Sequence, residues 1–186
     1  MSVGIIGPVR LSYMHVFEPR ANNFKDGKEE YSLTMLLPKE PNEFCPDPKA
    51  IGAQIMGYVK AALLKKFGKE PGKWANPLKD GDVETDAEGN PKYPGYWYCN
   101  AKSDEKPILI DGYCEPVVGG WQSGDWARVK VNFYGYDRES RGVGAGLRCI
   151  QFVAKDEAFG EDRSPEAIAK EFGTVAPDGG SGDPFQ

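Results

Sequence analysis

The stretch WARVKVNFYGYD (126–137) alternates two kinds of side chain along its length. Successive side chains of a β-strand point to opposite faces, so residues two apart share a face. One face collects small and apolar side chains, namely Ala127, Val129, Val131 and Phe133. The other collects rings and polar or cationic groups, namely Trp126, Arg128, Lys130, Asn132, Tyr134 and Tyr136. The pattern predicts a strand with one face in a core and the other face outside.

The outer face of this strand combines aromatic rings with cations. Rings alone would suit a second core, and charges alone would suit an ordinary solvated surface. Both together are typical of a surface for single-stranded nucleic acid, where rings stack on bases and cations neutralise phosphates.

A second stretch, YWYCNAKS (96–103), repeats the pattern. The inner set is Trp97, Cys99 and Ala101, and the outer set is Tyr96, Tyr98, Asn100 and Lys102. The alternative interpretation of this stretch is an amphipathic edge whose tyrosines cover a neighbouring loop.

The first half of the chain predicts a hairpin followed by a helix. The strand-like runs 10–19 and 31–38 are joined by the turn-rich NNFKDGKE. The helix is predicted over 48–67, because Asp47 suits the N-cap, Pro48 the first helical position and Gly68 the stop. Its apolar stripe recurs every four residues, at Ile51, Ile55, Val59, Leu63 and Phe67.

The second half predicts a long loop and then more strands. Residues 69–95 are rich in Pro, Gly and acidic side chains, and we expect a loop excursion there. Strands are expected at 96–103, 107–110, 126–137 and 147–156, with RESRGVGAG (138–146) as a mobile hairpin loop. The whole predicts a mainly β, antiparallel small barrel with one packed helix.

The net charge of −5 is unevenly distributed along the 186 residues. Residues 156–186 hold eight acidic and two basic side chains, whereas the remaining 155 residues carry +1. Five of the acids in that remainder lie in DGDVETDAEG (80–89). We therefore expect a weakly basic body with two acidic segments, which is compatible with nucleic-acid binding.

Composition also narrows the class of protein. Apolar residues make up 40% and charged residues 27%, as in soluble globular proteins, and neither a membrane span nor a signal peptide is expected. Four cysteines (Cys45, Cys99, Cys114 and Cys149) stand far apart, and His15 is the single histidine. This spacing argues against structural zinc and against a disulfide framework, and it favours a reducing cytoplasm and no cofactor.

Motifs for catalysis are weak in this chain. The alternate acids of 80–88 resemble a calcium loop, but Thr85 stands where that loop needs glycine, so a solvated hairpin tip is expected. GVGAG (142–146) lies between two strands and not between a strand and a helix, so it is no dinucleotide fingerprint. The sequence favours a binding protein over an enzyme.

The chain resembles the bacteriophage single-stranded DNA-binding proteins once described as a domain of unknown function. The likeness is carried by FEPRANNFKDGKEEYSLTMLLPK, the helix, YWYCNAKS, GDWARVKVNFYGYD and GVGAGLRCIQFVAKDEAFG, and covers most of residues 10–160. It implies an OB-fold barrel that coats single-stranded DNA in phage replication, recombination or repair, in the cytoplasm of the infected host. One feature departs from the usual OB order: only two obvious strand runs precede the helix, so either residues 3–19 supply more than one strand or the barrel is elaborated.

The resemblance divides the chain into a DNA-binding domain (1–160) and a short helix with a flexible acidic tail (161–186). The tail ends DGGSGDPFQ, and a frayed terminus is its plain interpretation. Similar acidic, aromatic tails restrain DNA binding and recruit replication or recombination proteins of phage or host. The residues implied in that role are Asp178, Asp183, Pro184 and Phe185. A pocket that reads a terminal phenylalanine with its carboxylate would be mismatched, because one residue follows Phe185.

The residues predicted to bind single-stranded DNA are Tyr96, Tyr98, Asn100, Lys102, Trp126, Arg128, Lys130, Tyr134, Tyr136, Arg138, Arg141 and Arg148. Two other hypotheses stay open. One is a non-catalytic β-barrel module, such as a phage accessory protein, whose aromatic face holds another protein. The other is a metal-dependent nuclease that uses the acids of 80–88. The sequence also leaves open whether copies of this chain form a homo-oligomer.

Overall fold

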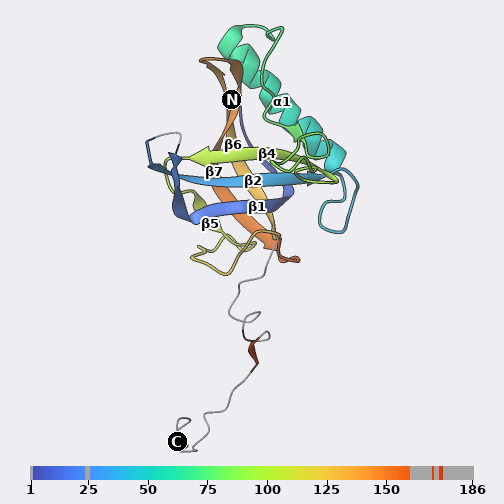
Figure 1. Ribbon diagram of the computed structural model, residues 1–186, viewed down its shortest axis with the longest axis vertical. Helices are drawn as coiled ribbons and strands as arrows, with labels where there is room; N and C mark the ends of the chain where they lie inside the picture. The colour runs from blue at the N-terminus through green and yellow to red at the C-terminus, as the bar shows by residue number, and fades with distance from the viewer. Residues whose placement is uncertain (1, 24–25, 160–168, 170–171, 174–186) are drawn as a thin grey trace, which may run out of the picture.

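The computed structural model describes residues 2–23, 26–159, 169 and 172–173. Its main elements are the α-helix α1 and a seven-stranded sheet (Figure 1). The elements are β1 (Val3–Asn22), β2 (Lys28–Pro38), α1 (Pro48–Phe67), β3 (Lys79–Asp80), β4 (Tyr96–Ser103), β5 (Ile108–Ile110), β6 (Trp126–Asp137) and β7 (Arg141–Ala154).

Five of the strands close into a barrel. β1 pairs antiparallel with both β2 and β6, β2 pairs with β4, and β6 pairs with β7. A parallel bridge from Lys102 of β4 to Gly146 of β7 completes the ring. The predicted mainly β, OB-fold-like barrel with one packed helix is confirmed. The unusual helix order has a simple origin: segments 3–7 and 10–19 form one long strand, so α1 lies between the second and third barrel strands.

The helix begins and ends where the sequence indicates. The Asp47 side chain accepts a hydrogen bond from the Ala50 N–H (3.1 Å), and Pro48 occupies the first turn. Gly68 is left-handed (φ 74°), and its N–H donates to the Leu64 carbonyl at 2.8 Å. Four members of the predicted stripe are buried, namely Ile51, Ile55, Val59 and Leu63, and Phe67 is partly buried. No helix in the described part of the chain is long and apolar enough to span a membrane.

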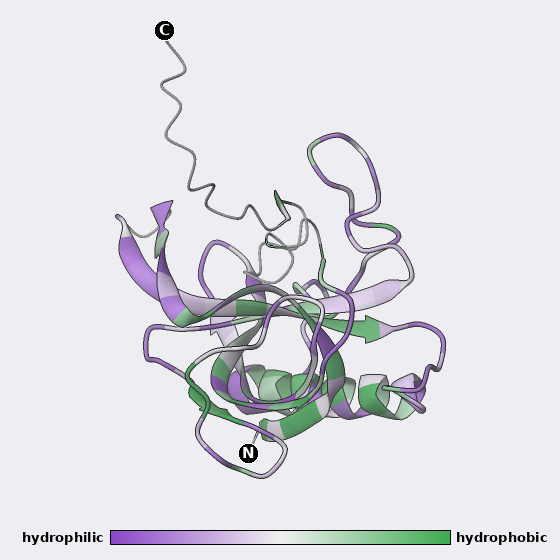
Figure 2. Ribbon diagram, turned by 90° about the horizontal axis from the view of Figure 1, so that it is seen from below, coloured by the Kyte–Doolittle hydropathy of each residue, from purple (hydrophilic) through white to green (hydrophobic). Residues whose placement is uncertain are grey.

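The barrel interior is filled by the predicted inner face of β6. Ala127, Val129, Val131 and Phe133 are at most 2% exposed. Figure 2 shows hydrophobic residues on α1 and the barrel strands and hydrophilic residues on the projecting loops. Cys45 and Cys99 belong to this core, whereas Cys114 is exposed and Cys149 half-buried.

The prediction that Trp126 lies on the outer face is wrong. Its side chain is 1% exposed, stacks on Phe44 with ring centroids 5.2 Å apart, and donates its indole N–H to Asp156 Oδ2 at 2.8 Å. The pairing of β6 with β7 shifts register between Trp126 and Ala127. A shift of this kind interrupts the alternation of faces, so both residues point inward.

The faces of β4 also differ from the simple alternation at the start of that strand. Cys99 and Ala101 are buried as predicted, but Trp97 is 38% exposed and lies under the Lys39 ammonium, 4.9 Å from the ring centroid. Tyr98 is 2% exposed because Tyr93, from the loop before β4, packs on it at 4.9 Å. The alternative interpretation, a tyrosine that covers a neighbouring loop, is correct at Tyr98.

The glycine-rich stretch expected as a loop is mostly strand. β7 begins at Arg141, so the turn of the β6–β7 hairpin is confined to residues 138–140. In Figure 1 this hairpin rises beside the C-terminal end of α1.

The acidic excursion is tied to the barrel. Lys39 Nζ lies 2.6 Å from both Asp80 Oδ1 and Asp82 Oδ2, and these contacts lower the pKa of both carboxyls and raise that of the lysine. A bridge between Thr85 and Pro91 forms the expected hairpin tip. These carboxylates therefore serve the loop itself, and the described residues include no cluster of metal-ligating side chains.

We expect Trp126→Ala to lower the free energy of unfolding by about 3–5 kcal/mol, because it removes a fully buried ring and leaves a cavity. Denaturant unfolding measures the loss, with the half-exposed Trp97→Ala as the matched control. Similar, small losses in both variants would contradict the placement of Trp126 in the core.

Candidate nucleic-acid interface

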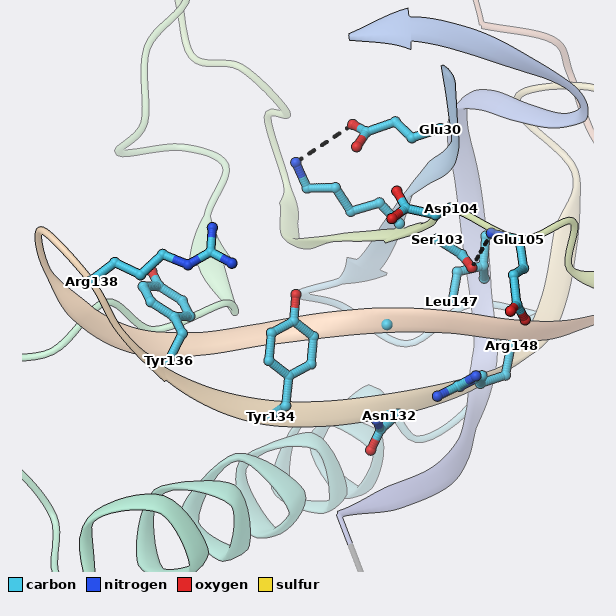
Figure 3. Close-up of a pocket in the computed structure, with 12 residues that line it drawn as sticks. Glu30, Ser103, Asp104, Glu105, Asn132, Tyr134, Tyr136, Arg138, Leu147 and Arg148 are labelled. Carbon is cyan, nitrogen blue, oxygen red and sulfur yellow. Dashed lines mark hydrogen bonds and ion pairs between the residues drawn. The ribbon is translucent and has the colours of Figure 1, made fainter. Parts of the chain in front are cut away.

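A groove of about 600 Å³ lies on the outside of the barrel, across β4, β6 and β7. It is bordered by the start of β2 and by the β6–β7 hairpin. Of the twelve predicted residues, the groove brings together five from three strands and the hairpin turn: Lys102, Tyr134, Tyr136, Arg138 and Arg148. Figure 3 shows Tyr134 and Tyr136 pointing from β6 toward the wall that carries Glu30 and Asp104.

The two tyrosine rings lie over Gly142 and Gly144 of β7, which we call the glycine bed. Strand pairing places Tyr134 opposite Gly144 and Tyr136 opposite Gly142. A Cβ added at Gly144 would stand 2.7 Å from Tyr134 Cζ, and one at Gly142 would stand 2.5 Å from Tyr136 Oη. Because glycine has no side chain, the rings occupy the space above β7, and Tyr134 remains 47% exposed. This arrangement leaves aromatic surface in the groove available for stacking.

The groove holds cations and carboxylates in similar number. The cations are Lys102, Arg138 and Arg148, and the carboxylates are Glu30, Asp104 and Glu105. Lys102 Nζ lies 3.6 Å from Glu30 Oε1, and Lys28, beside the groove, lies 2.7 Å from Asp104 Oδ2. The acids therefore gather on the wall formed by the start of β2 and the end of β4, opposite the tyrosines.

Three further predicted residues stand on the outer barrel surface but do not line the groove. Arg128 and Lys130 are exposed along β6, and Arg128 Nη1 donates weakly to Gln151 Oε1 at 3.4 Å. Asn100 is exposed on β4 and accepts a hydrogen bond from Thr34 Oγ1 at 2.8 Å. Arg128 and Lys130 add positive charge on the side of the tyrosines.

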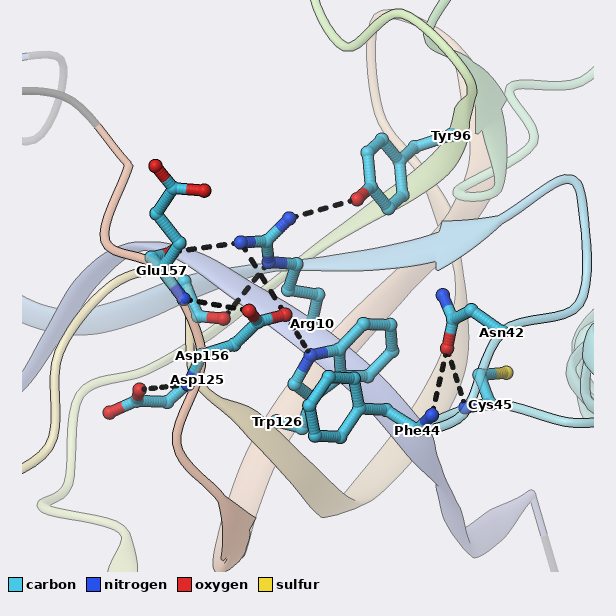
Figure 4. Close-up of polar contacts among 10 residues, drawn as sticks. Arg10, Asn42, Phe44, Cys45, Tyr96, Asp125, Trp126, Asp156 and Glu157 are labelled. Atoms are coloured by element: carbon cyan, nitrogen blue, oxygen red, sulfur yellow. Dashed lines mark hydrogen bonds and ion pairs between the residues drawn. The ribbon is translucent and has the colours of Figure 1, made fainter.

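Tyr96 is the first residue of β4, at the end of the strand away from Lys102. It lines a hollow that is separate from the groove, and its hydroxyl is fixed by Arg10. The guanidinium of Arg10 donates to the Tyr96 hydroxyl (3.1 Å), to the Gly124 carbonyl (2.9 Å) and to the Glu157 carbonyl (2.8 Å) (Figure 4). Asp156 Oδ2 lies 3.6 Å from the same guanidinium. Burial raises the pKa of Asp156, but hydrogen bonds from Trp126 and the Glu157 N–H, with the charge of Arg10, bring its net shift downward.

Three predicted residues do not face the groove. Tyr98 and Trp126 are buried, so neither ring is available for stacking, and burial raises the pKa of Tyr98. Arg141 falls on the helix side of the hairpin, where it pairs with Asp137 at 3.4 Å and lies over the Phe67 ring at 5.7 Å. The idea that Arg141 closes over the groove is wrong, since β7 already begins at this residue and turns its side chain toward α1.

The tail residues Asp178, Asp183, Pro184 and Phe185 lie outside the described residues, and their predicted role stays a prediction. Other groove residues were missed. Glu30 directly precedes the predicted strand run 31–38, and Asp104 and Glu105 directly follow YWYCNAKS, so these groove residues lie one or two positions beyond the predicted strands.

Comparison with known proteins gives a consistent family. The model of a family described as Enterobacter phage Enc34, ssDNA-binding protein, matches residues 2–179. The "Putative protein p50" of Acyrthosiphon pisum secondary endosymbiont phage 1 is 30% identical over 159 residues, which cover 81% of this chain and 83% of that protein.

Solved structures share the fold. The single-stranded DNA-binding protein from bacteriophage Enc34, solved in complex with ssDNA, superposes with a TM-score of 0.70 at 22% identity, covering 86% of this chain and 90% of that chain. The bacteriophage T7 single-stranded DNA-binding protein gp2.5 gives a TM-score of 0.53 at 12% identity, covering 88% of this chain and 98% of that one.

The family model spans nearly the whole chain, including the β6–β7 hairpin and its glycine bed. The chain therefore belongs to the Enc34 family of phage single-stranded DNA-binding proteins.

Proposed function

We propose that this protein binds single-stranded DNA along the groove, largely independently of sequence and without catalysis. The observation that carries the proposal is the pair of tyrosine rings on glycines 142 and 144, flanked by Lys102, Arg138 and Arg148. Rings that stack on bases beside cations that follow the backbone are typical of sequence-tolerant single-strand binding. Membership of the family, and a relative solved in complex with ssDNA, support the same function.

The position of the groove on the barrel supports this proposal. OB-folds bind oligonucleotides on the face of their second and third strands, between the loop that joins the first two strands and the loop that joins the last two. Here β2 and β4 are the second and third barrel strands, and Glu30 and Arg138 mark the ends of the β1–β2 and β6–β7 hairpins. A bound strand would cross β4 and lie between these hairpins.

The charges that line the groove would orient the bound DNA strand. Carboxylates of Glu30, Asp104 and Glu105 disfavour phosphates on their wall. The phosphodiester backbone is therefore expected near Arg138, Arg148 and the adjacent Lys130, while the bases stack on Tyr134 and Tyr136. Every base presents a π-face, so this mode of binding tolerates any sequence.

The proposed biological role is to coat single-stranded DNA, and it follows from binding that tolerates any sequence. A sequence-tolerant binder coats single strands exposed during phage DNA replication, recombination or repair, in the cytoplasm of the infected host. The acidic residues 161–186 would restrain binding and recruit replication or recombination proteins. That segment carries six acids and two bases, and its negative charge would compete with DNA phosphates for Arg138, Arg148 and the adjacent Lys130.

The first test is a titration of labelled oligo-dT, beside duplex DNA, followed by fluorescence anisotropy at several salt concentrations. We expect tight single-strand binding that weakens with salt. Tyr134→Ala should cost about 1–3 kcal/mol with an unchanged salt slope, because it removes stacking. Arg148→Gln should reduce the slope of log K against log salt by about 0.7, because it removes one phosphate contact.

Two exposed residues outside the groove give matched controls, Tyr113→Ala and Lys49→Gln. Neither should alter affinity or slope. If a folded wild-type protein does not respond to single strands, the proposal fails, and the protein-interaction module becomes the better hypothesis. Cleavage of the oligonucleotide in magnesium or manganese would instead support a nuclease.

Gly144→Ala tests the glycine bed. The added methyl group would meet the Tyr134 ring, which must rotate away and lose its position over β7. We expect weaker oligo-dT binding with little change in the melting temperature, since the ring lies at the end of a flexible side chain. Gly57→Ala is the control, because a Cβ there meets nothing within 4 Å. Equal affinity of the Gly144→Ala and wild-type proteins would show that the ring position is irrelevant to binding.

Removal of residues 161–186 tests the tail. This segment carries −4 of the total −5, so the remaining chain is close to neutral. We expect tighter binding of oligo-dT at low salt and a difference that fades as salt screens the charge. A full-length version whose six tail acids are replaced by their amides should match the shortened chain. If it instead matches the wild type, charge competition is not the mechanism.

A further inference from the structure

We propose a second base-binding subsite in the hollow at the far end of β4, where one nucleobase of the same bound DNA strand stacks on Tyr13. This inference deepens the proposed function and depends on it. The hollow has a volume of about 620 Å³ and is separate from the groove. Its walls carry four aromatic residues from three parts of the chain, Tyr13, Tyr93, Tyr96 and Phe159.

Tyr13 is the main reason for this assignment. It is 65% exposed, and its backbone is left-handed with φ of 45°, a conformation that bulky residues rarely adopt. The pairing of β1 with β2 shifts register between Ser12 and His15, which turns this ring out over the hollow. Strained backbone tends to persist where it holds a side chain for function. Here it holds a large ring in solvent, where the ring contributes little to the core.

The other walls of the hollow are fixed in place. Tyr93 meets Tyr13 edge to face at 6.4 Å and packs on Tyr98. Tyr96 is held through its hydroxyl by Arg10 (Figure 4). The Arg10 guanidinium also lies over the Phe159 ring, 4.1 Å from its centroid. Walls that are already ordered lose little conformational freedom when a ligand enters, which favours binding. Lys92, also at the hollow, supplies a cation for a phosphate beside the base.

Strand β4 extends from the hollow to the groove. Lys102 lines the groove, Tyr96 lines the hollow, and the outward-facing Asn100 lies between them on β4. Six residues of strand span about 20 Å. A DNA strand that crosses β4 in the groove and then turns along β4 toward Tyr96 would therefore reach both sites, within the range of about 4–16 nucleotides that a single OB-fold covers. This continuity with the proposed groove, and the cation at Lys92, identify single-stranded DNA as the occupant.

The experiment compares two labelled oligo-dT probes on the full chain, one of about five nucleotides and one of about twenty. Tyr13→Ala should weaken binding of the long probe at least about fivefold and leave the short probe, which the groove alone can hold, nearly unchanged. Tyr134→Ala should weaken both probes. Tyr13→Phe should keep the affinity of the wild type, because the ring that stacks is retained.

Tyr13→Gly separates stacking from folding. Glycine adopts a positive φ without strain, so this variant should melt no lower than Tyr13→Ala, yet should lose the same affinity for the long probe. If Tyr134→Ala weakens binding but no Tyr13 variant does, the subsite is overturned while the proposed function stands. If Tyr13→Ala matters only when residues 161–186 are present, the hollow holds the tail and not a base. If no probe binds the wild type, the proposed function itself fails.

Discussion

One strand, β6, has to serve the barrel core and the groove at once. From Ala127 onward its side chains alternate, so each residue that fills the interior is followed by one that faces outward. Val129, Val131 and Phe133 are buried, and between and after them stand Lys130, Asn132 and Tyr134. A slip of one residue in the pairing of β6 would exchange these sets and place a lysine in the core. The stability of the barrel therefore fixes the outward direction of the groove residues.

The hairpin that carries the tyrosines is supported from behind by α1. At Gly135 the helix approaches the strand backbone so closely that an added Cβ would lie 2.5 Å from Lys66 Cβ. Tyr58 of the helix also stacks on Phe133, with ring centroids 6.2 Å apart. The helix α1, which lies between the second and third barrel strands in the chain, thus packs both on the barrel core and on the last hairpin. Under the proposed function, support of this kind would lower the conformational entropy that the groove residues lose when DNA binds.

Much of the fold follows from local sequence rules, and the failures have local causes. The cap at Asp47, the stop at Gly68 and the bounds of β6 are all visible in the sequence, since caps and alternation act over a few residues. Trp126 was misplaced because a register shift depends on the partner strand. Tyr98 was assigned to the binding surface because nothing in its own strand indicates that Tyr93 covers it. Contacts between distant segments, such as Arg10 with Tyr96, leave no periodic signal at all.

The balance of charge in the groove bears on how the protein would hold DNA. Lys102 already lies beside Glu30, so a phosphate that recruits this lysine replaces one ion pair with another. Only 12% of the Glu30 side chain is exposed, so drawing Lys102 away leaves a largely buried carboxylate with one partner fewer, and the net gain from such an exchange is small. No ion pair has to be broken before a base stacks on Tyr134 or Tyr136, because glycines let these rings lie against β7. Stacking should then supply a larger share of the affinity than in a strongly basic groove, with Arg138, Arg148 and Lys130 setting the dependence on salt. A net negative protein with a balanced groove is consistent with single-strand binding on this physical basis.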